Sequence, residues 1–295
     1  MNNSTPHGTP HLMQHGSPDL VYVKKANGVL EPFDQEKLVG SLDRAGVDKK
    51  TINEIVGHVL SELQNGITTG EIYAHAFEML NRNSRVHAIT YSLRRALSEL
   101  GPNGFPFEKF ISEILKEKGY NVLTDQIVQG RCVAHEMDVV AWNDKELIMI
   151  EAKFHNEFGL KSDVKVALYV KARFDDLKTV TFNYGGKDRQ LTDGWLVTNT
   201  KFTEQAIAYG ACTGLTMIGW NYPLKGNLLH LIEDSRLHPF TCLATLTTNH
   251  KKKLLDLGVI LCRDISRNPK ILNEIGLSAD EIKNVMAEID NVCVA

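Results

Sequence analysis

Residues 130–156, GRCVAHEMDVVAWNDKELIMIEAKFHN, predict two β-strands joined by a tight turn. Residues 135–142 alternate between polar and apolar side chains and then become continuously apolar, and residues 147–154 form a second apolar run. Between them, Asn143-Asp144-Lys145 supplies the residue types that favour a turn. The segment therefore reads as a hairpin whose strands are largely buried.

Two acids interrupt these strands, Asp138 in the first and Glu151 in the second, and Lys153 follows two residues later. Because side chains alternate along a strand, Glu151 and Lys153 share one face, and the hairpin can bring Asp138 beside them. Two carboxylates beside an ammonium suit a hard cation such as Mg²⁺ or Mn²⁺, which takes oxygen ligands. The alternative is a structural ion pair of Asp138 with Lys153, which would leave Glu151 buried and unpaired, at a high cost.

The composition is that of a soluble globular protein. The chain has 295 residues, enough for two domains of ordinary size, and 43% of them are hydrophobic. Its net charge of −3 does not mark the whole molecule as a nucleic-acid binder, so any contact with phosphate must come from a local basic patch.

Cysteine usage and hydropathy favour a cytoplasmic protein with no membrane partner. The five cysteines are scattered, odd in number and form no Cys-x-x-Cys pair, which is typical of reduced thiols. No apolar run reaches the roughly 18 residues of a membrane span, and the N-terminus lacks the core of a signal peptide.

Residues 1–20 are rich in Asn, Ser, Pro, Gly and His, which predicts a disordered tail. His7, His11 and His15 have a spacing that would suit a metal on a helix. The Gly and Pro residues among them argue against that helix.

Residues 21–100 predict a small α+β unit, a hairpin followed by four helices. Asn27-Gly28 is a strong hairpin signal, and Asp34 is placed to cap the first helix. Thr68-Thr69-Gly70-Glu71 has the pattern of a capping box at the start of the third helix.

The segment VKKANGVLEPFDQEKL at residues 23–38, together with TTGEI and YSLRR further on, resembles the ATP-cone, a regulatory nucleotide-binding domain. The resemblance departs from the family at Ala26, where Arg is usual. It implies a regulatory ligand, ATP or dATP, contacted by the following residues, of which the last two match the motif less closely: Lys25, Glu31, Asp34, Lys37, Thr69 and Arg95. Independently, Lys25, Lys37 and Arg95 could surround a triphosphate, which requires several donors. The alternative is that Asp34 is only a helix cap and the lysines are solvated.

A linker, Gly101-Pro102-Asn103-Gly104, separates this unit from a segment of different composition. Apolar residues at helical spacing predict a helix over 107–118, and a strand follows over 120–128. Glu108 at the start of that helix either complements the helix dipole or is an outer acid of the metal site.

A helix is predicted over 163–177, and on it Lys165, Tyr169 and Arg173 form a polar stripe at a spacing of four residues. The stripe is either the solvated face of a core helix or a basic edge that contacts a phosphate backbone. Downstream, a strand over 194–198, a helix over 204–212 and a strand over 215–220 have short joins, which predicts a parallel crossover. The domain is therefore expected to be a mixed sheet with helices on both faces.

Residues 107–232 resemble the Mrr-type branch of the PD-(D/E)xK nucleases. The ordered motifs are FEKFISEILKEKGYNV, HEMDVV, IEAKFHN, GWLVTNTKFTEQAIAYG and LTMIGWNYP. The resemblance implies that Asp138, Glu151 and Lys153 form the catalytic core, with Glu108 in support. Lys165 matches a further helix position at which Gln is more usual.

Residues 241–295 predict a helical tail with two similar segments, LLDLGV and LNEIGL, which weakly resemble helix-hairpin-helix modules. The capping box Ser278-Ala279-Asp280-Glu281 begins its last helix. Residues 250–253, His-Lys-Lys-Lys, make with Arg263 and Arg267 the most basic local surface, which either is solvated or binds DNA through Lys251 and Lys252.

These patterns predict four segments: a tail (1–20), a nucleotide-sensing unit (21–100), a nuclease domain (101–240) and a helical tail (241–295). We expect a Mg²⁺-dependent endonuclease that cleaves double-stranded DNA and forms homo-oligomers. ATP or dATP would regulate it without being hydrolysed, since no Walker motif is present. The alternative is a nucleotide-responsive DNA-binding regulator whose nuclease fold is catalytically silent.

Overall fold

The computed structural model describes residues 21–25, 28–43, 45–101, 103–156 and 160–293. The histidines His7, His11 and His15 and the predicted tail lie outside these residues, as do Ala26 and Asn27 of the first turn.

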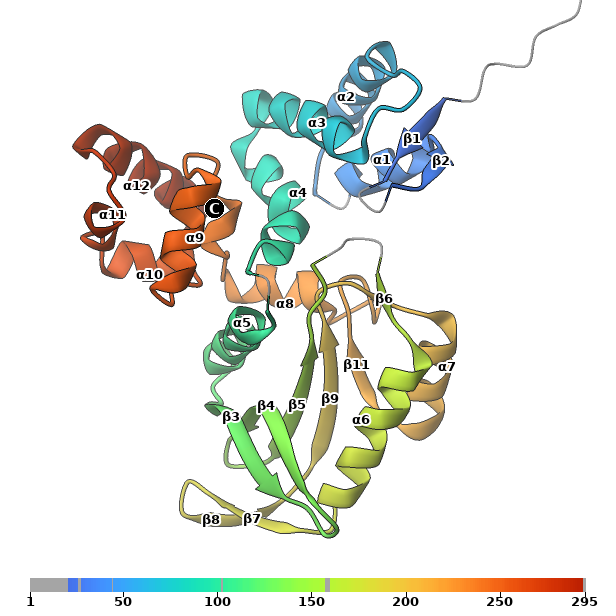
Figure 1. Ribbon diagram of the computed structural model, residues 1–295, viewed down its shortest axis with the longest axis vertical. Coiled ribbons are helices and arrows are strands. Elements are labelled where there is room, and N and C mark those ends of the chain that lie inside the picture. The colour runs from blue at the N-terminus through green and yellow to red at the C-terminus, as the bar shows by residue number, and fades with distance from the viewer. Residues whose placement is uncertain (1–20, 26–27, 44, 102, 157–159, 294–295) are drawn as a thin grey trace, which may run out of the picture.

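The first unit consists of a hairpin followed by four helices, as predicted (Figure 1). The hairpin strands pair antiparallel, with Tyr22 opposite Pro32. The capping box forms: the Thr68 hydroxyl accepts the Glu71 amide at 3.1 Å, and the Glu71 carboxylate accepts the Thr68 amide at 2.8 Å. The elements are β1 (Tyr22–Lys24), β2 (Leu30–Pro32), α1 (Gln35–Asp43), α2 (Lys49–Ser61), α3 (Thr69–Asn83) and α4 (Arg85–Ser98).

The second unit is built on a five-stranded mixed sheet in the order β11-β9-β5-β4-β3. The hairpin predicted over residues 130–156 lies at its centre: β4 pairs antiparallel with both β3 and β5. On the other side, β5, β9 and β11 are parallel, which confirms the predicted crossover. The strands are β3 (Asn121–Gln129), β4 (Ala134–Trp142), β5 (Leu147–Lys153), β9 (Asp193–Thr198) and β11 (Thr216–Ile218).

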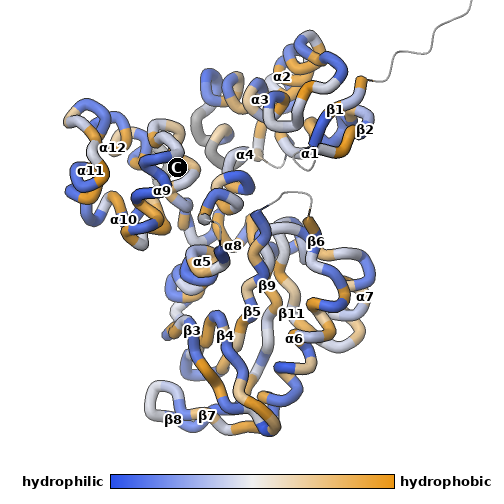
Figure 2. Tube along the Cα trace, in the orientation of Figure 1, coloured by the Kyte–Doolittle hydropathy of each residue, from blue (hydrophilic) through white to orange (hydrophobic). Residues whose placement is uncertain are grey.

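Helices cover both faces of this sheet. One face packs on α5 (Phe105–Glu117) and α8 (Leu228–Ser235), with Phe107 and Phe110 fully buried. The other face packs on α6 (Val164–Leu177) and α7 (Glu204–Thr213), which joins β9 to β11. Figure 2 shows hydrophobic stretches both in the strands and in the helices that cover them. The result is the mixed sheet with helices on both faces that the sequence predicts.

Two small strand pairs were not predicted from the sequence. β7 (Thr181–Tyr184) and β8 (Lys187–Gln190) form a hairpin whose two turn residues, Gly185 and Gly186, both have positive φ, 64° and 72°. A Gly-Gly pair is a recognised signal for this turn, so this hairpin could have been predicted from the sequence. The second pair, β6 (Lys161–Ser162) with β10 (Lys201–Phe202), is only two residues long and carries no such signal.

The C-terminal helices form a module with a hydrophobic cluster of its own. Its only buried acid among the described residues, Glu288, accepts the backbone amides of Ala244 and Thr245 at 3.0 and 2.9 Å and so ties the last helix to the loop before α9. The elements are η1 (Phe240–Cys242), α9 (Thr248–Asp256), α10 (Cys262–Arg267), α11 (Ile271–Glu274) and α12 (Ala279–Cys293).

This module docks on α5 and α4 through polar contacts. Arg263 pairs with Glu113 at 2.9 Å and also with Glu117, both on α5. The Lys109 ammonium donates to the Gly258 carbonyl at 2.7 Å. On α4, Leu93 and Leu97 pack in the core of the five-stranded sheet unit, whereas Ala96 packs with the C-terminal helices. In Figure 1, α4 accordingly lies between the three parts of the molecule.

No helix in the described part of the chain is long and apolar enough to cross a membrane.

Gly194 allows a test of how tightly α6 packs on the sheet. A Cβ at this position of β9 would lie 2.3 Å from the Phe174 ring, so we expect Gly194→Ala to destabilise the protein by about 1–3 kcal/mol. Gly57 in α2 has open space around its Cα, so Gly57→Ala should instead stabilise its unit, by about 0.5–1 kcal/mol. Urea denaturation measures both variants, and a neutral Gly194→Ala would contradict the close packing.

Candidate active site

The two central strands part at Asp138. The last residue pair between β4 and β5 is Val139 opposite Ile150, whereas β5 remains paired with β9 as far as Lys153 opposite Thr198. Beyond the fork, the Asp138 carboxylate accepts the Ala152 amide at 2.6 Å, which replaces a ladder hydrogen bond that the diverging backbone no longer makes. The fork opens a gap at this edge of the sheet and places the Asp138 carboxylate in it.

The four residues expected to form the catalytic centre line one cavity of about 470 Å³ at this fork. Asp138 comes from β4, Glu151 and Lys153 from β5, and Glu108 from the first turn of α5. Glu151 and Lys153 therefore share one side of their strand, as the alternation predicts. The other residues that line the cavity are Gly104, Ala152, Phe154, His155, Asn156 and Leu160.

The carboxylates of this cavity repel one another in a partly desolvated site. Burial, and next the charge of Glu151, raise the pKa of Asp138 to about 7. Burial, and next the charge of Asp138, raise the pKa of Glu108 to about 7 as well. Burial also raises the pKa of Glu151, against the opposing effects of Arg173 and Lys153. A divalent cation bound among these carboxylates would relieve their repulsion, which Arg173 and Lys153 offset at Glu151 only.

A further acid, Asp125, lies close to this group and was not picked out from the sequence. It has positive φ, 53°, in the middle of β3, between the pairs Thr124–Val139 and Gln126–Met137 that flank Asp138. Its charge contributes to the raised pKa of Glu108. Nothing in the local sequence marks the site, because an Asp inside a strand reads as an ordinary solvent-facing residue.

Lys153 is exposed at the end of β5 and, within the described residues, makes no ion pair. Its charge lowers the pKa of Glu151, and burial together with the charge of Lys153 lowers the pKa of His155. The structural alternative, an Asp138–Lys153 pair that leaves Glu151 alone, is not what the structure contains. Glu151 is the paired acid, and its partner is Arg173.

Arg173 lies in a different place from the one expected. The sequence left two alternatives, a solvated face of the helix or a basic edge that contacts a phosphate backbone, and both place Arg173 on the surface. It is instead 8% exposed, and its guanidinium binds Glu151 and the Glu136 carbonyl. The helical stripe is right for Lys165 and Tyr169, which are exposed. Arg173 continues the stripe after Tyr169, but its long side chain reaches the strand fork, where the guanidinium binds Glu151 and the Glu136 carbonyl instead of facing solvent.

Buried polar side chains hold the end of β5 in place. The Asn199 side chain accepts the His155 amide and donates to the His155 carbonyl, each at 2.8 Å. The His155 ring lies 3.0 Å from the Ser162 hydroxyl, beside the buried Thr198 and Thr200. The Thr-Asn-Thr motif at residues 198–200 belongs to one of the stretches that resemble the Mrr-type nucleases. Its positioning contacts could not have been deduced from spacing.

The donor set fits a hard divalent ion with an incomplete protein shell. Among the described residues, no group of three or more His, Cys, Asp or Glu side chains is arranged as a metal centre. Mg²⁺, however, is ordinarily held by one or two carboxylates and keeps several waters. Asp138 and Glu151, two oxygen donors facing one polar cavity, match that demand.

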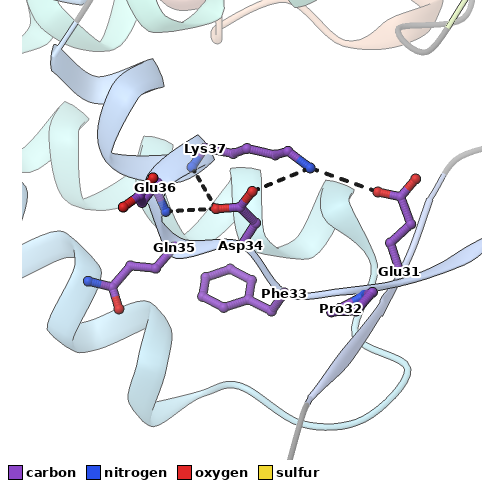
Figure 3. Close-up of a pocket in the computed structure, with 7 residues that line it drawn as sticks. All are labelled: Glu31, Pro32, Phe33, Asp34, Gln35, Glu36 and Lys37. Atoms are coloured by element: carbon purple, nitrogen blue, oxygen red, sulfur yellow. Dashed lines mark hydrogen bonds and ion pairs between the residues drawn. The ribbon is translucent and has the colours of Figure 1, made fainter.

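Most of the residues expected to bind a nucleotide lie near the first hairpin, where Thr68, beside Thr69, bridges to Lys24, whereas Arg95 lies on α4. Lys25 pairs with Glu31 at 2.8 Å, and Lys37 lies 3.5 Å from Asp34 and 4.0 Å from Glu31. Figure 3 shows the Lys37 side chain extending over Asp34 toward Glu31, on a cavity of about 490 Å³ lined by residues 31–37. Here the acids neutralise the lysines.

Thr69 and Arg95 do not line that cavity. Thr69 is the first residue of α3. The Arg95 guanidinium stacks 5.1 Å above the centre of the Tyr73 ring and pairs with Glu99 at 2.9 Å.

The residues expected to contact DNA differ in their exposure. Lys165 and Lys252 are exposed on α6 and α9. Lys251 is mostly covered and binds Glu99 at 3.2 Å and the Thr241 carbonyl, so it joins the C-terminal module to α4. Arg263 is likewise engaged with α5. The basic surface read from residues 250–263 is therefore partly an internal docking surface.

The raised pKa of Asp138 makes stability depend on pH in the absence of metal. Its folded-state value of about 7 exceeds the ordinary 3.8, so its contribution is present at low pH and is lost as pH rises from about 4 to about 7. We expect Asp138→Asn to avoid this loss and to be more stable than wild type near pH 8, by on the order of 2 kcal/mol after partial solvation is allowed for. Near pH 5 the two proteins should differ less.

Urea denaturation in EDTA at several pH values measures this difference. The exposed Asp144 serves as the control, because its pKa is lowered by Lys187 and Asp144→Asn should not stabilise the protein at high pH. An Asp138→Asn variant that is no more stable than wild type near pH 8 would contradict the electrostatic account.

Comparison with known proteins divides the chain at the same linker. Residues 102–219 match a restriction endonuclease family, which confirms the resemblance read from the motifs, and residues 238–293 match the AF1548-like C-terminal family. An uncharacterized protein of Archaeoglobus fulgidus is 39% identical over 183 residues, which are 62% of this chain and 99% of that protein. The crystal structure of AF1548, a protein of unknown function, has 38% identity and a TM-score of 0.51, and the match covers 65% of this chain and 99% of that one.

Proposed function

Because the chain belongs to the AF1548-like family and carries a restriction endonuclease domain at residues 102–219, we propose that it is a Mg²⁺-dependent DNA endonuclease. One observation carries the proposal: Glu108, Asp138, Glu151 and Lys153, from three separate elements, line one polar cavity at the strand fork. The substrate we propose is double-stranded DNA, and the reaction is hydrolysis of a phosphodiester bond.

The side chains of the cavity have separable parts in this reaction. Asp138 and Glu151 would hold the divalent ion, which when bound supplies positive charge against the charge that develops on the phosphoryl group. The exposed Lys153 ammonium can donate to a phosphoryl oxygen or to the attacking water. Glu108, with a pKa of about 7, can take up or release a proton near neutral pH.

Asp138→Ala and Lys153→Ala are expected to lower metal-dependent plasmid cleavage by about 100-fold or more, because each removes charge stabilisation at the reacting phosphate. Binding to the same DNA should persist, since most of the affinity comes from phosphate contacts elsewhere on the surface. Asp144→Ala and Lys145→Ala, which alter exposed residues in the turn of the same hairpin, are the matched controls and should cleave normally. Metal-dependent nicking by Asp138→Ala at the wild-type rate would refute the assignment.

The second candidate is a DNA-binding regulator with a silent nuclease fold, and the Glu151–Arg173 ion pair favours it. A carboxylate already engaged by a guanidinium has less capacity for an ion. This candidate predicts DNA retardation without cleavage in either Mg²⁺ or Mn²⁺, with methylated and unmethylated plasmid alike.

We further propose that residues 21–100 bind ATP or dATP and thereby bias oligomerisation or access to DNA. Glu31, Asp34 and Lys37 line one cavity and Lys25 pairs with Glu31, which supports this proposal. A ligand at about 100 times its dissociation constant shifts such an equilibrium by about 2.7 kcal/mol if it binds one state only.

Lys37→Ala should weaken ATP binding by about tenfold, the loss of one charge-assisted contact to phosphate. Lys50→Ala removes a lysine from the exposed side of α2, where the side chain is 87% exposed, and should leave the affinity unchanged. Isothermal titration calorimetry with ATP and with dATP measures both variants. Equal affinities for Lys37→Ala and wild type would place the nucleotide elsewhere.

A further inference from the structure

Arg173 bridges the two strands at the point where they separate. One terminal nitrogen, Nη2, donates to the Glu136 carbonyl on β4, and the other, Nη1, donates to Glu151 Oε2 on β5. The strands are no longer paired with each other here, since their last pair is Val139 opposite Ile150. The guanidinium thus connects the two branches of the fork that holds Asp138.

The surroundings of Arg173 are those of a fixed group rather than of a solvated side chain. It is 8% exposed, and its guanidinium lies 5.3 Å from the centre of the Tyr169 ring, which covers it from the solvent side of α6. Within the described residues its Nε has no hydrogen-bond partner. A planar guanidinium can donate to two acceptors in one fixed orientation, whereas a lysine ammonium cannot reproduce that two-donor geometry.

The contact of Arg173 with Glu151 uses one carboxylate oxygen. Only Oε2 is engaged in the contacts described above, while the Glu151 side chain also lines the active-site cavity. A carboxylate held through one oxygen keeps a defined orientation for the other. Asp138 is held in a comparable way, through its Oδ2 on the Ala152 amide.

We propose that Arg173 is a positioning residue whose guanidinium fixes both the Glu151 carboxylate and the diverging end of β4, so that Glu151 and Asp138 can hold one divalent ion together. The inference rests on the proposed metal-dependent nuclease function and adds to it the residue that sets the geometry of its ligands. Groups that orient metal ligands without touching the metal commonly change its affinity by about 10–100-fold when they are altered.

Two other roles for Arg173 make different predictions. If it only filled space under Tyr169, a well-folded lysine variant would bind metal like wild type. If it competed with the ion for Glu151, removing its charge would tighten metal binding. Arg173→Lys distinguishes a positioning role from a space-filling role, because lysine keeps the positive charge but cannot donate to both acceptors in the fixed geometry of a guanidinium.

The test is calorimetric titration of the full-length protein with Mn²⁺, comparing wild type with Arg173→Lys and Arg173→Gln, each checked for folding by its thermal transition. We expect Arg173→Lys to bind Mn²⁺ about tenfold more weakly than wild type. Arg189→Lys is the matched control, because Arg189 also joins backbone carbonyls, those of Tyr184 and Asn143, but outside the cavity. Its affinity for Mn²⁺ should equal that of wild type.

Each outcome bears on one proposal. Wild-type affinity in a folded Arg173→Lys, or tighter binding by Arg173→Gln, would overturn the positioning role and leave the nuclease proposal intact. Mn²⁺ binding that is absent from wild type, or unchanged in Asp138→Ala, would overturn the metal site itself and this inference with it. Should neither Arg173 variant fold, Tyr169→Ala uncovers the guanidinium without touching a carboxylate, and an unchanged affinity there would overturn the inference.

Discussion

The hydrogen bond from the Ala152 amide to the Asp138 carboxylate is the interaction on which the candidate site depends. Where β4 leaves β5, the backbone of β5 would lose a ladder partner, and the Asp138 side chain supplies one at 2.6 Å. A buried backbone amide without a partner costs free energy, so the Asp138 carboxylate stabilises the fork in addition to the metal-binding role proposed for it. The other features of the site follow from the separation of β4 and β5 at Asp138. The carboxylates crowd together, Arg173 connects the two branches, and Asn199 holds the end of β5.

Charge around the fork is arranged in layers. Glu108, Asp138 and Glu151 face the cavity, Lys153 lies at its exposed rim, and Arg173 lies beneath the strands. The buried cation offsets part of the repulsion among the acids without entering the space where an ion and a phosphate would meet. Arg173 and Lys153, both near Glu151, therefore have different environments. Arg173 is fixed by its hydrogen bonds, whereas Lys153 is exposed and could contact a substrate.

The sequence was sufficient for the central hairpin and for the shared face of Glu151 and Lys153, because both follow from short-range patterns, whereas Glu108 was reached through a family resemblance and Asp125 was missed. Alternation along residues 135–142 and 147–154 predicts the hairpin, and the i, i+2 relation of Glu151 and Lys153 predicts their shared face. The environment of Arg173 could not be predicted in the same way. Helical periodicity says which residues share a stripe, but the direction of that stripe depends on how α6 packs on the sheet. Lys251 and Arg263 illustrate the same limit, since their acidic partners are about 150 residues away in the chain.

The contacts between the C-terminal module and α5 tie distant parts of the chain to the chemistry. Lys109, which binds the Gly258 carbonyl, directly follows Glu108, and Arg263 grips Glu113 and Glu117 further along the same helix. The C-terminal module therefore stabilises α5, the helix whose first turn carries Glu108. A shortened chain ending near residue 240 would leave Glu117 without its Arg263 partner and Glu113 with Lys116 alone, and Lys109 would lose its contact with the Gly258 carbonyl. The helix that carries Glu108 is thus held from two sides, by the apolar core of the sheet and by polar contacts from the C-terminal module.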